Sequence, residues 1–264
     1  MSPVLRNIPY GDGVRQIGDL HLPQRRAPGV PTIPVLLIHG GGWNALSKES
    51  LDPIARLAAS EGRSVFSINY RLLDHAPWPA CFDDCVTAAR FMLSGGLTLH
   101  ELCAPTEGRL LIIGASAGGH LAMLTGLALG ASGCAGIISL AGPSRIVPGP
   151  ADTAASAITT PGFLEKFFGA DVAPDTWRAA SPTALITSNA PPLHTIHSRN
   201  DRLVPLAHSE EAVSAWRSAG VAARLDTFDG PGEQHGFWTT ADLKTRELIP
   251  PLEHLLRQAV RAPI

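Results

Sequence analysis

The chain has 264 residues, of which 45% are hydrophobic and 17% charged, and its formal net charge at pH 7 is -2. This length allows one large α/β domain with a substantial core, and without a basic excess the composition indicates no nucleic-acid partner and no binding to an anionic membrane. Because no run of about 20 apolar residues is present to cross a bilayer, and residues 1–7 lack the pattern of a secretory signal, we expect a cytoplasmic protein.

Strand and helix patterns alternate along most of the chain. Residues 4–22 alternate loosely around Gly11-Asp-Gly13, which indicates a hairpin, and residues 23–34 are rich in Pro and Arg, as in an exposed connector. The further elements expected are strand 33–38, helix 51–61, strand 64–70, helix 80–93, strand 110–113, a helix running to about residue 129, strand 136–140, strand 192–197, helix 206–219, strand 222–228 and a closing helix 240–260. This alternation predicts a single α/β domain over residues 1–264, with a mostly parallel central sheet of about eight strands flanked by helices.

The first glycine-rich turn follows strand 33–38, which runs straight into His39-Gly-Gly-Gly-Trp43. Three consecutive glycines cost backbone entropy and pack nothing, which disfavours a mere tight turn. A glycine cluster at the carboxyl end of a strand can instead aim several N–H groups at an anion. We expect the N–H groups of Gly41 and Gly42 to form part of an oxyanion hole, and His39 to brace the loop by hydrogen bonding.

A second small-residue turn follows strand 110–113, whose continuous apolar run is typical of a strand buried on both faces. Gly114-Ala-Ser-Ala-Gly118 matches G-x-S-x-G, in which the serine occupies a strained turn between a strand and a helix. Bulkier side chains at 114 and 118 would collide in such a turn. We expect Ser116 to be a nucleophile and the N–H of Ala117 to be a third oxyanion donor; the alternative is an ordinary loop or capping serine.

A serine hydroxyl becomes a good nucleophile only when a base takes its proton and a carboxylate orients that base. Asp201 lies four residues past strand 192–197, and His235 lies seven residues past strand 222–228. The order Ser, Asp, His is the one that this topology requires. The sequence therefore predicts a catalytic triad of Ser116, Asp201 and His235.

Each partner has an alternative. Asp201 could instead cap the helix that begins near Leu206, with Asp229 as the replacement acid. His235 could be a surface-loop histidine, in which case His197 is the least poor substitute. We expect His197 to lie inside its strand and to point the wrong way to serve as the base.

The stretch 144–190 breaks the alternation of strands and helices. It is rich in Pro, Ala and Thr around one helix-like piece, residues 161–168. About 45 residues without strong strand character are too many for a plain connection. We expect a lid-like insertion over the site.

The cysteines form no pattern of a metal site or a disulfide framework. Cys81 and Cys85 are expected one helical turn apart, and Cys103 and Cys134 are isolated. We expect all four to be reduced and buried, and we predict no metal and no cofactor.

Several motifs together resemble those of α/β-hydrolase esterases: His39-Gly-Gly-Gly-Trp43, Asn69-Tyr-Arg-Leu72, Gly114-Ala-Ser-Ala-Gly-Gly-His-Leu-Ala122, Ala180-Ser-Pro182 with Ala190-Pro-Pro192, Asp201 with Val204-Pro205, and His235-Gly-Phe237. The likeness covers nearly the whole chain. It is to the hormone-sensitive-lipase-like group, and most closely to small acetyl-xylan and feruloyl esterases and the related kynurenine formamidases. It implies the same triad, the same oxyanion donors, and structural roles for Tyr70 and Arg71.

Two features depart from this resemblance. Ser198 stands where relatives usually have Gly after the strand histidine, which leaves the shape of the acid loop open. The amino-terminal part is also too short for the helical cap of many hormone-sensitive-lipase relatives. The resemblance therefore implies that residues 144–190 and 73–79 form the pocket walls.

The leading hypothesis is a cofactor-free serine hydrolase that cleaves short-acyl carboxylic esters through an acyl-enzyme. A small-molecule ester is expected because no exposed apolar lid helix is apparent. Trp43, Trp78 and Phe163 are candidate substrate-binding residues, although aromatic residues such as these more often belong to the core. The alternatives are an arylformamidase of the N-formylkynurenine type or another small-amide hydrolase, and a non-catalytic ligand-binding protein on the same fold. A homodimer is compatible with the sequence. The sequence does not identify the natural substrate.

Overall fold

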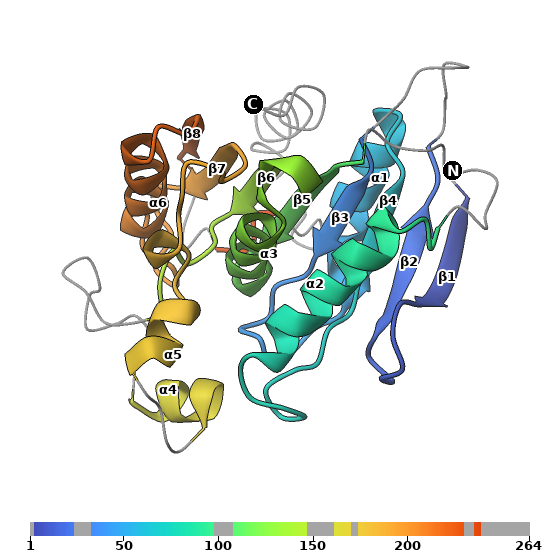
Figure 1. Ribbon diagram of the computed structural model, residues 1–264, viewed down its shortest axis with the longest axis horizontal. Helices are drawn as coiled ribbons and strands as arrows, with labels where there is room; N and C mark the ends of the chain where they lie inside the picture. The colour runs from blue at the N-terminus through green and yellow to red at the C-terminus, as the bar shows by residue number, and fades with distance from the viewer. Residues whose placement is uncertain are drawn as a thin grey trace.

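The computed structural model describes residues 3–23, 33–97, 108–146, 161–169, 174–229 and 235–238. Figure 1 shows the helices and strands that these residues form. In chain order they are β1 (Val4–Pro9), β2 (Ile17–His21), β3 (Val35–Ile38), η1 (Lys48–Leu51), α1 (Asp52–Ser60), β4 (Val65–Ile68), α2 (Ala80–Leu93), β5 (Leu110–Ala115), α3 (Ala117–Gly133), β6 (Cys134–Leu140), α4 (Pro161–Phe168), α5 (Pro174–Ala179), η3 (Pro182–Ala184), β7 (Leu193–Ser198), α6 (Ala207–Ser218) and β8 (Ala223–Phe228).

The described strands form one 8-stranded sheet in the order β1-β2-β4-β3-β5-β6-β7-β8. Strand β2 pairs antiparallel with β1 and with β4, and the other neighbouring strands are parallel. The hairpin expected over residues 4–22 and the mostly parallel sheet of about eight strands are both confirmed. The carboxyl ends of β5, β7 and β8 therefore meet at one edge of the sheet, because parallel neighbours run in the same direction.

The central strands are buried on both faces, because successive side chains of a strand point to opposite sides. Leu36 and Ile38 of β3 join the core cluster that contains residues of α2, α3 and α6, whereas Val35 and Leu37 join the cluster that contains residues of α1. Figure 1 shows α2 and α3 side by side on one face of the sheet. This double burial explains why β3 and β5 are continuously apolar in sequence.

Several elements differ from the sequence-based expectation. The helix expected from residue 51 is preceded by a 3-10 turn, and α3 continues to Gly133 across a break at Gly130, where φ is 64°. Helix α5 was not predicted, because six residues are less than two helical turns and show no clear hydrophobic period. The closing helix expected over 240–260 and the connector over 24–32 lie outside the described residues.

The stretch 144–190 is described in part. Its first residue contacts a later part of the stretch, because the N–H of Thr183 donates to Ser144 O at 3.2 Å. Arg145 pairs with Glu211 of α6 at 2.9 Å, and this ion pair attaches the beginning of the stretch to α6. Helix α4 is attached elsewhere, since Trp78 N–H donates to Phe167 O at 2.8 Å. That this stretch is a lid-like insertion within a single domain stays a prediction.

Within the described ranges, no helix has the length and apolar composition that a membrane span needs. Cys81, Cys85 and Cys134 are buried free thiols, and Cys103 lies outside the described residues. Burial raises the pKa of Cys81 and of Cys134 to about 12, so neither thiol ionises readily at neutral pH. No group of three or more potential metal ligands occurs among the described residues.

Candidate active site

Ser116 occupies the sharp turn between β5 and α3. Its φ of 53° and ψ of -121° lie in a region that costs a non-glycine residue energy. Its N–H donates to Leu140 O of β6 at 2.8 Å, and its carbonyl accepts the N–H of His120 at 3.1 Å. These bonds hold the strained residue at the carboxyl edge of the sheet, at the positive end of α3.

Glycine is required on both sides of this serine. A Cβ on Gly114 would lie 2.0 Å from Gly118 O, and a Cβ on Gly118 would lie 2.1 Å from Ile38 O. The expectation that larger side chains would collide at both positions is confirmed. The absence of a side chain at 118 also lets α3 pack directly on the carboxyl end of β3.

The structure brings the three predicted catalytic side chains into one hydrogen-bonded chain. His235 Nε2 lies 2.8 Å from Ser116 Oγ, and His235 Nδ1 lies 2.7 Å from Asp201 Oδ2. When Nδ1–H donates to the carboxylate, Nε2 is left to accept the serine proton. This is the arrangement in which an acid orients a base and the base activates a nucleophile.

The Asp201 side chain is completely buried, and each of its oxygens is occupied. Oδ1 accepts the N–H groups of Leu203 and Val204, both at 2.9 Å. Burial by itself would raise the pKa of Asp201, but hydrogen bonds from His197 and His235 hold that pKa well below its usual range. Turn capping and orientation of His235 are thus compatible, because they use different oxygens.

The sequence left open the roles of two further residues, Asp229 and Ser198. Asp229, the replacement acid considered there, is exposed and pairs with Arg199 at 2.9 Å. Ser198, which stands where relatives have Gly, is buried, and its Oγ accepts the N–H of Asn200 at 3.2 Å. The serine therefore supports the turn that carries Asp201 beyond the end of β7.

The glycine loop lies against the nucleophile turn, since a Cβ on Gly40 would be 3.2 Å from Ser116 Cβ. Gly41 and Gly42 have φ values of 99° and 58°, which favour glycine. Among the described residues, no acceptor receives the N–H of either glycine or of Ala117, the first residue of α3. These three N–H groups therefore remain available in the two turns that meet at Ser116; that they bind an oxyanion stays a prediction.

His39 and Tyr70 support this glycine loop by hydrogen bonds to its backbone carbonyl groups. His39 Nδ1 donates to Gly40 O at 2.7 Å, and Tyr70 Oη lies 3.0 Å from His39 O and 3.2 Å from Gly40 O. The two rings stack with their centroids 4.3 Å apart. Burial lowers the pKa of His39 to about 3, so this histidine is neutral and supports the loop, as expected.

The three aromatic residues suggested as substrate contacts lie in a packed cluster. Trp43 is 1% exposed and Trp78 is 7% exposed, while Phe163 of α4 is half-buried. Phe167 of α4 joins them, with its ring centroid 5.2 Å from that of Trp43 and 5.5 Å from that of Trp78. Core packing accounts for both tryptophans, and contact of any of the three with a substrate stays a prediction.

His120 is a buried residue of the site region whose role the sequence did not assign. It lies one turn after Ser116 on α3, where its Nδ1 accepts the N–H of Trp43 Nε1 at 3.3 Å. Its Nε2 donates to Ala180 O at 2.7 Å. Burial lowers the pKa of His120 to about 4. A neutral imidazole thus links the glycine loop to the end of α5.

The depressed pKa values of His39 and His120 make the protein less stable in acid. Below about pH 6.5 these side chains become protonated in the unfolded chain but stay neutral in the folded protein. Protons therefore favour unfolding, and the free energy of unfolding should fall by up to about 1.4 kcal/mol per pH unit for each histidine between about pH 6.5 and pH 4. Urea unfolding at pH 7.5, 5.5 and 4.5 measures this slope. His120→Gln should reduce it, and an unchanged slope would contradict the assignment.

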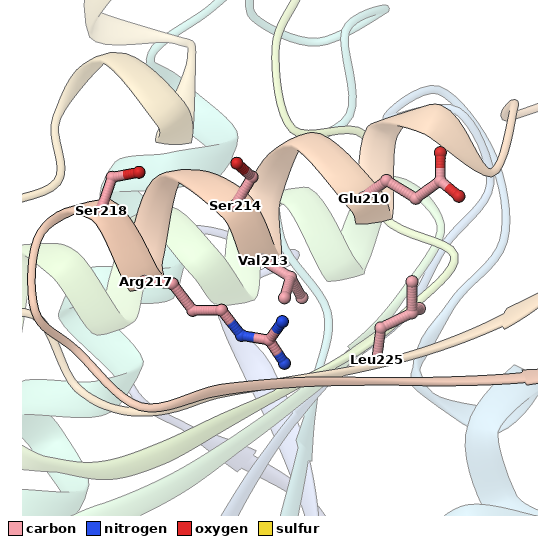
Figure 2. Close-up of a pocket in the computed structure, with 6 residues that line it drawn as sticks. All are labelled: Glu210, Val213, Ser214, Arg217, Ser218 and Leu225. Atoms are coloured by element: carbon pink, nitrogen blue, oxygen red, sulfur yellow. The ribbon is translucent and has the colours of Figure 1, made fainter.

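Figure 2 shows a surface depression elsewhere on the molecule, between α6 and the edge strand β8. Its volume is about 590 Å³. It is lined by Glu210, Val213, Ser214, Arg217, Ser218 and Leu225. None of these is a candidate active-site residue, and the Arg217 guanidinium already donates to Ala223 O.

The sequence matches the BD-FAE family model over residues 19–216. Esterase LipC of Mycobacterium tuberculosis is 27% identical over 255 residues, which cover 88% of this chain and 59% of the relative. Esterase LipQ of the same organism is 28% identical over 277 residues, which cover 95% of this chain and 61% of the relative. The chain thus spans about three fifths of the length of these relatives.

Solved structures show the same fold. The thermophilic esterase Est2 from Thermogutta terrifontis superposes with a TM-score of 0.74 at 21% identity, covering 98% of this chain and 91% of that chain. A truncated carbohydrate esterase from gut microbiota gives a TM-score of 0.74 at 20% identity, with 99% and 97% covered.

Proposed function

Because the chain belongs to the BD-FAE family, we propose that it is a serine hydrolase that cleaves short-acyl carboxylic esters through an acyl-enzyme on Ser116. The observation that carries this proposal is the hydrogen-bonded chain from Ser116 through His235 to Asp201, with distances of 2.8 and 2.7 Å. The esterase relatives LipC and LipQ support ester hydrolysis as the reaction class.

In the acylation half of this reaction, Ser116 Oγ attacks the ester carbonyl while its proton moves to His235 Nε2. Asp201 keeps Nδ1–H directed at its carboxylate and stabilises the positive imidazolium that forms. The N–H groups of Gly41, Gly42 and Ala117 donate to the negative oxygen of the tetrahedral intermediate, and one such donor typically contributes about 3 to 4 kcal/mol. When the C–O bond breaks, His235 returns the proton to the leaving alcohol.

Deacylation repeats these steps with water. His235 Nε2 takes a proton from water as the water oxygen attacks the acyl carbon, and the same donors stabilise the second tetrahedral intermediate. Collapse of this intermediate releases the carboxylic acid, and the proton on His235 returns to Ser116 Oγ. No group beyond the side chains and backbone of the site is needed for this cycle.

The short acyl chain is proposed from the aromatic cluster. Trp43 directly follows the glycine loop, and its indole reaches His120 one turn after Ser116. The Trp43 ring is backed by Phe163 and Phe167, with centroid distances of 5.5 and 5.2 Å. These rings occupy the space beside the first turn of α3, so we expect them to limit the length of the acyl group.

A substrate panel tests this proposal: p-nitrophenyl acetate, p-nitrophenyl octanoate, an acetylated xylo-oligosaccharide, methyl ferulate and N-formylkynurenine. We expect the acetyl esters to have the highest kcat/KM, with octanoate at least about tenfold lower, the order of difference that pocket size can give. Equal rates on acetate and octanoate would contradict the short acyl pocket. A clear preference for N-formylkynurenine would instead assign the arylformamidase reaction, which the same acyl-transfer groups can perform.

A further inference from the structure

His197 is a completely buried histidine that the proposed mechanism does not use. His197 lies inside β7, as expected, and its ring contacts the predicted acid. Its Nε2 lies 3.3 Å from Asp201 Oδ2, the same oxygen that lies 2.7 Å from His235 Nδ1. The chain turns back after β7, as Asp201 N–H donates to Ser198 O at 3.3 Å, and this return places Asp201 beside the ring.

Both ring nitrogens of His197 have further polar partners. Nε2 lies 2.9 Å from Val204 O, and Nδ1 lies 2.7 Å from the Oγ of Ser209 on α6. A carbonyl oxygen only accepts, so the hydrogen is on Nε2 and is donated to Val204 O in the acid loop, while Asp201 Oδ2 lies 3.3 Å from the same nitrogen. The ring is thereby held between β7, α6 and the loop that contains Asp201.

We propose that His197 is a positioning residue that fixes the Asp201 carboxylate in the orientation that His235 requires. This inference rests on the proposed function. The carboxylate also accepts the N–H groups of Leu203 and Val204, which belong to the same loop and move with it. His197 is anchored in a buried strand, so it connects the carboxylate to the sheet.

Two amide substitutions separate this role from simple packing. In His197→Asn the side chain reaches the place of Nδ1 and keeps a partner for Ser209, but it is too short for Asp201. In His197→Gln the amide reaches the place of Nε2 and keeps a donor toward Asp201. We expect His197→Asn to lower kcat at least tenfold with KM changed less than twofold, and His197→Gln to stay within about threefold of wild-type kcat. Rates are expressed per folded molecule, with the folded fraction taken from thermal unfolding.

A double-mutant cycle that compares kcat in single and double variants distinguishes positioning of the carboxylate from a purely structural role. Because His197 acts through the carboxylate, His197→Asn added to Asp201→Asn should lower kcat by less than a further twofold. If His197→Asn does not fold, Ser209→Ala removes only the hydroxyl that holds Nδ1, and we expect it to lower kcat a few-fold. Equal losses in the Asn and Gln variants, an undiminished effect in the Asp201→Asn background, or unchanged kcat in folded Ser209→Ala would overturn the proposal.

Hydrolysis of p-nitrophenyl acetate by the Ser116 and His197 variants separates the positioning role of His197 from the serine-hydrolase activity. If wild-type protein and Ser116→Ala hydrolyse p-nitrophenyl acetate equally, the serine-hydrolase proposal is wrong, and the positioning role falls with it. If the wild-type rate depends on Ser116 while the His197 variants keep full kcat, only the positioning role is overturned.

Discussion

Ser116→Ala should lower kcat on p-nitrophenyl acetate by about four to six orders of magnitude. The variant keeps the oxyanion donors and His235 but has no atom that can form the acyl-enzyme, and the remaining groups accelerate reaction with water only by about 10³- to 10⁴-fold. The measurement is initial rate against protein concentration, corrected for spontaneous hydrolysis. Mass spectrometry after quenching should find an acetyl adduct on wild type and none on the variant.

Ser139→Ala is a matched control for this experiment. Ser139 is a fully buried serine on β6, opposite Gly114 of β5, and its hydroxyl has no hydrogen-bond partner within the described residues. Removing that hydroxyl should leave kcat within about twofold of wild type. A Ser116→Ala protein that keeps more than one hundredth of wild-type kcat, at an unchanged Tm, would show that Ser116 is not the nucleophile.

Asp201→Asn should have the second-largest effect, a loss of about 10⁴-fold in kcat. The amide fills the same space, but it cannot stabilise the imidazolium, and an NH₂ group facing Nδ1 favours the tautomer with its hydrogen on Nε2. In that tautomer His235 cannot accept the serine proton. The measurement is kcat on p-nitrophenyl acetate together with Tm, which separates lost chemistry from lost folding.

Asp229→Asn is the control for this variant. Asp229 is the acid that the sequence offered as a replacement, and it is exposed and paired with Arg199 instead. Such a surface ion pair contributes about 0 to 1 kcal/mol, so kcat should stay within about twofold of wild type. A larger loss in Asp229→Asn than in Asp201→Asn would transfer the role of the acid to Asp229.

The order of the elements and the positions of the turns could be predicted from the amino-acid sequence alone. Helix α2 was predicted over 80–93, the range that the structure shows, because its apolar period and the glycines after it are local signals. The prediction that Ser116, Asp201 and His235 would meet followed from the parallel sheet, whose carboxyl strand ends share one edge. Positions just past those ends could therefore be assigned from spacing alone.

The directions of the side chains around these positions depend on tertiary packing and could not be predicted from local sequence. The contact of His197 with Asp201 was not predicted, because the path of the loop after β7 depends on long-range packing against α6. Trp43 and Trp78 lie almost completely buried, because α4 covers them from a distant part of the chain, and the sequence alone could not separate this packing from a role at a pocket. Periodicity records which residues are apolar and how far apart they are, whereas the neighbour that a side chain meets is set by contacts between segments far apart in sequence.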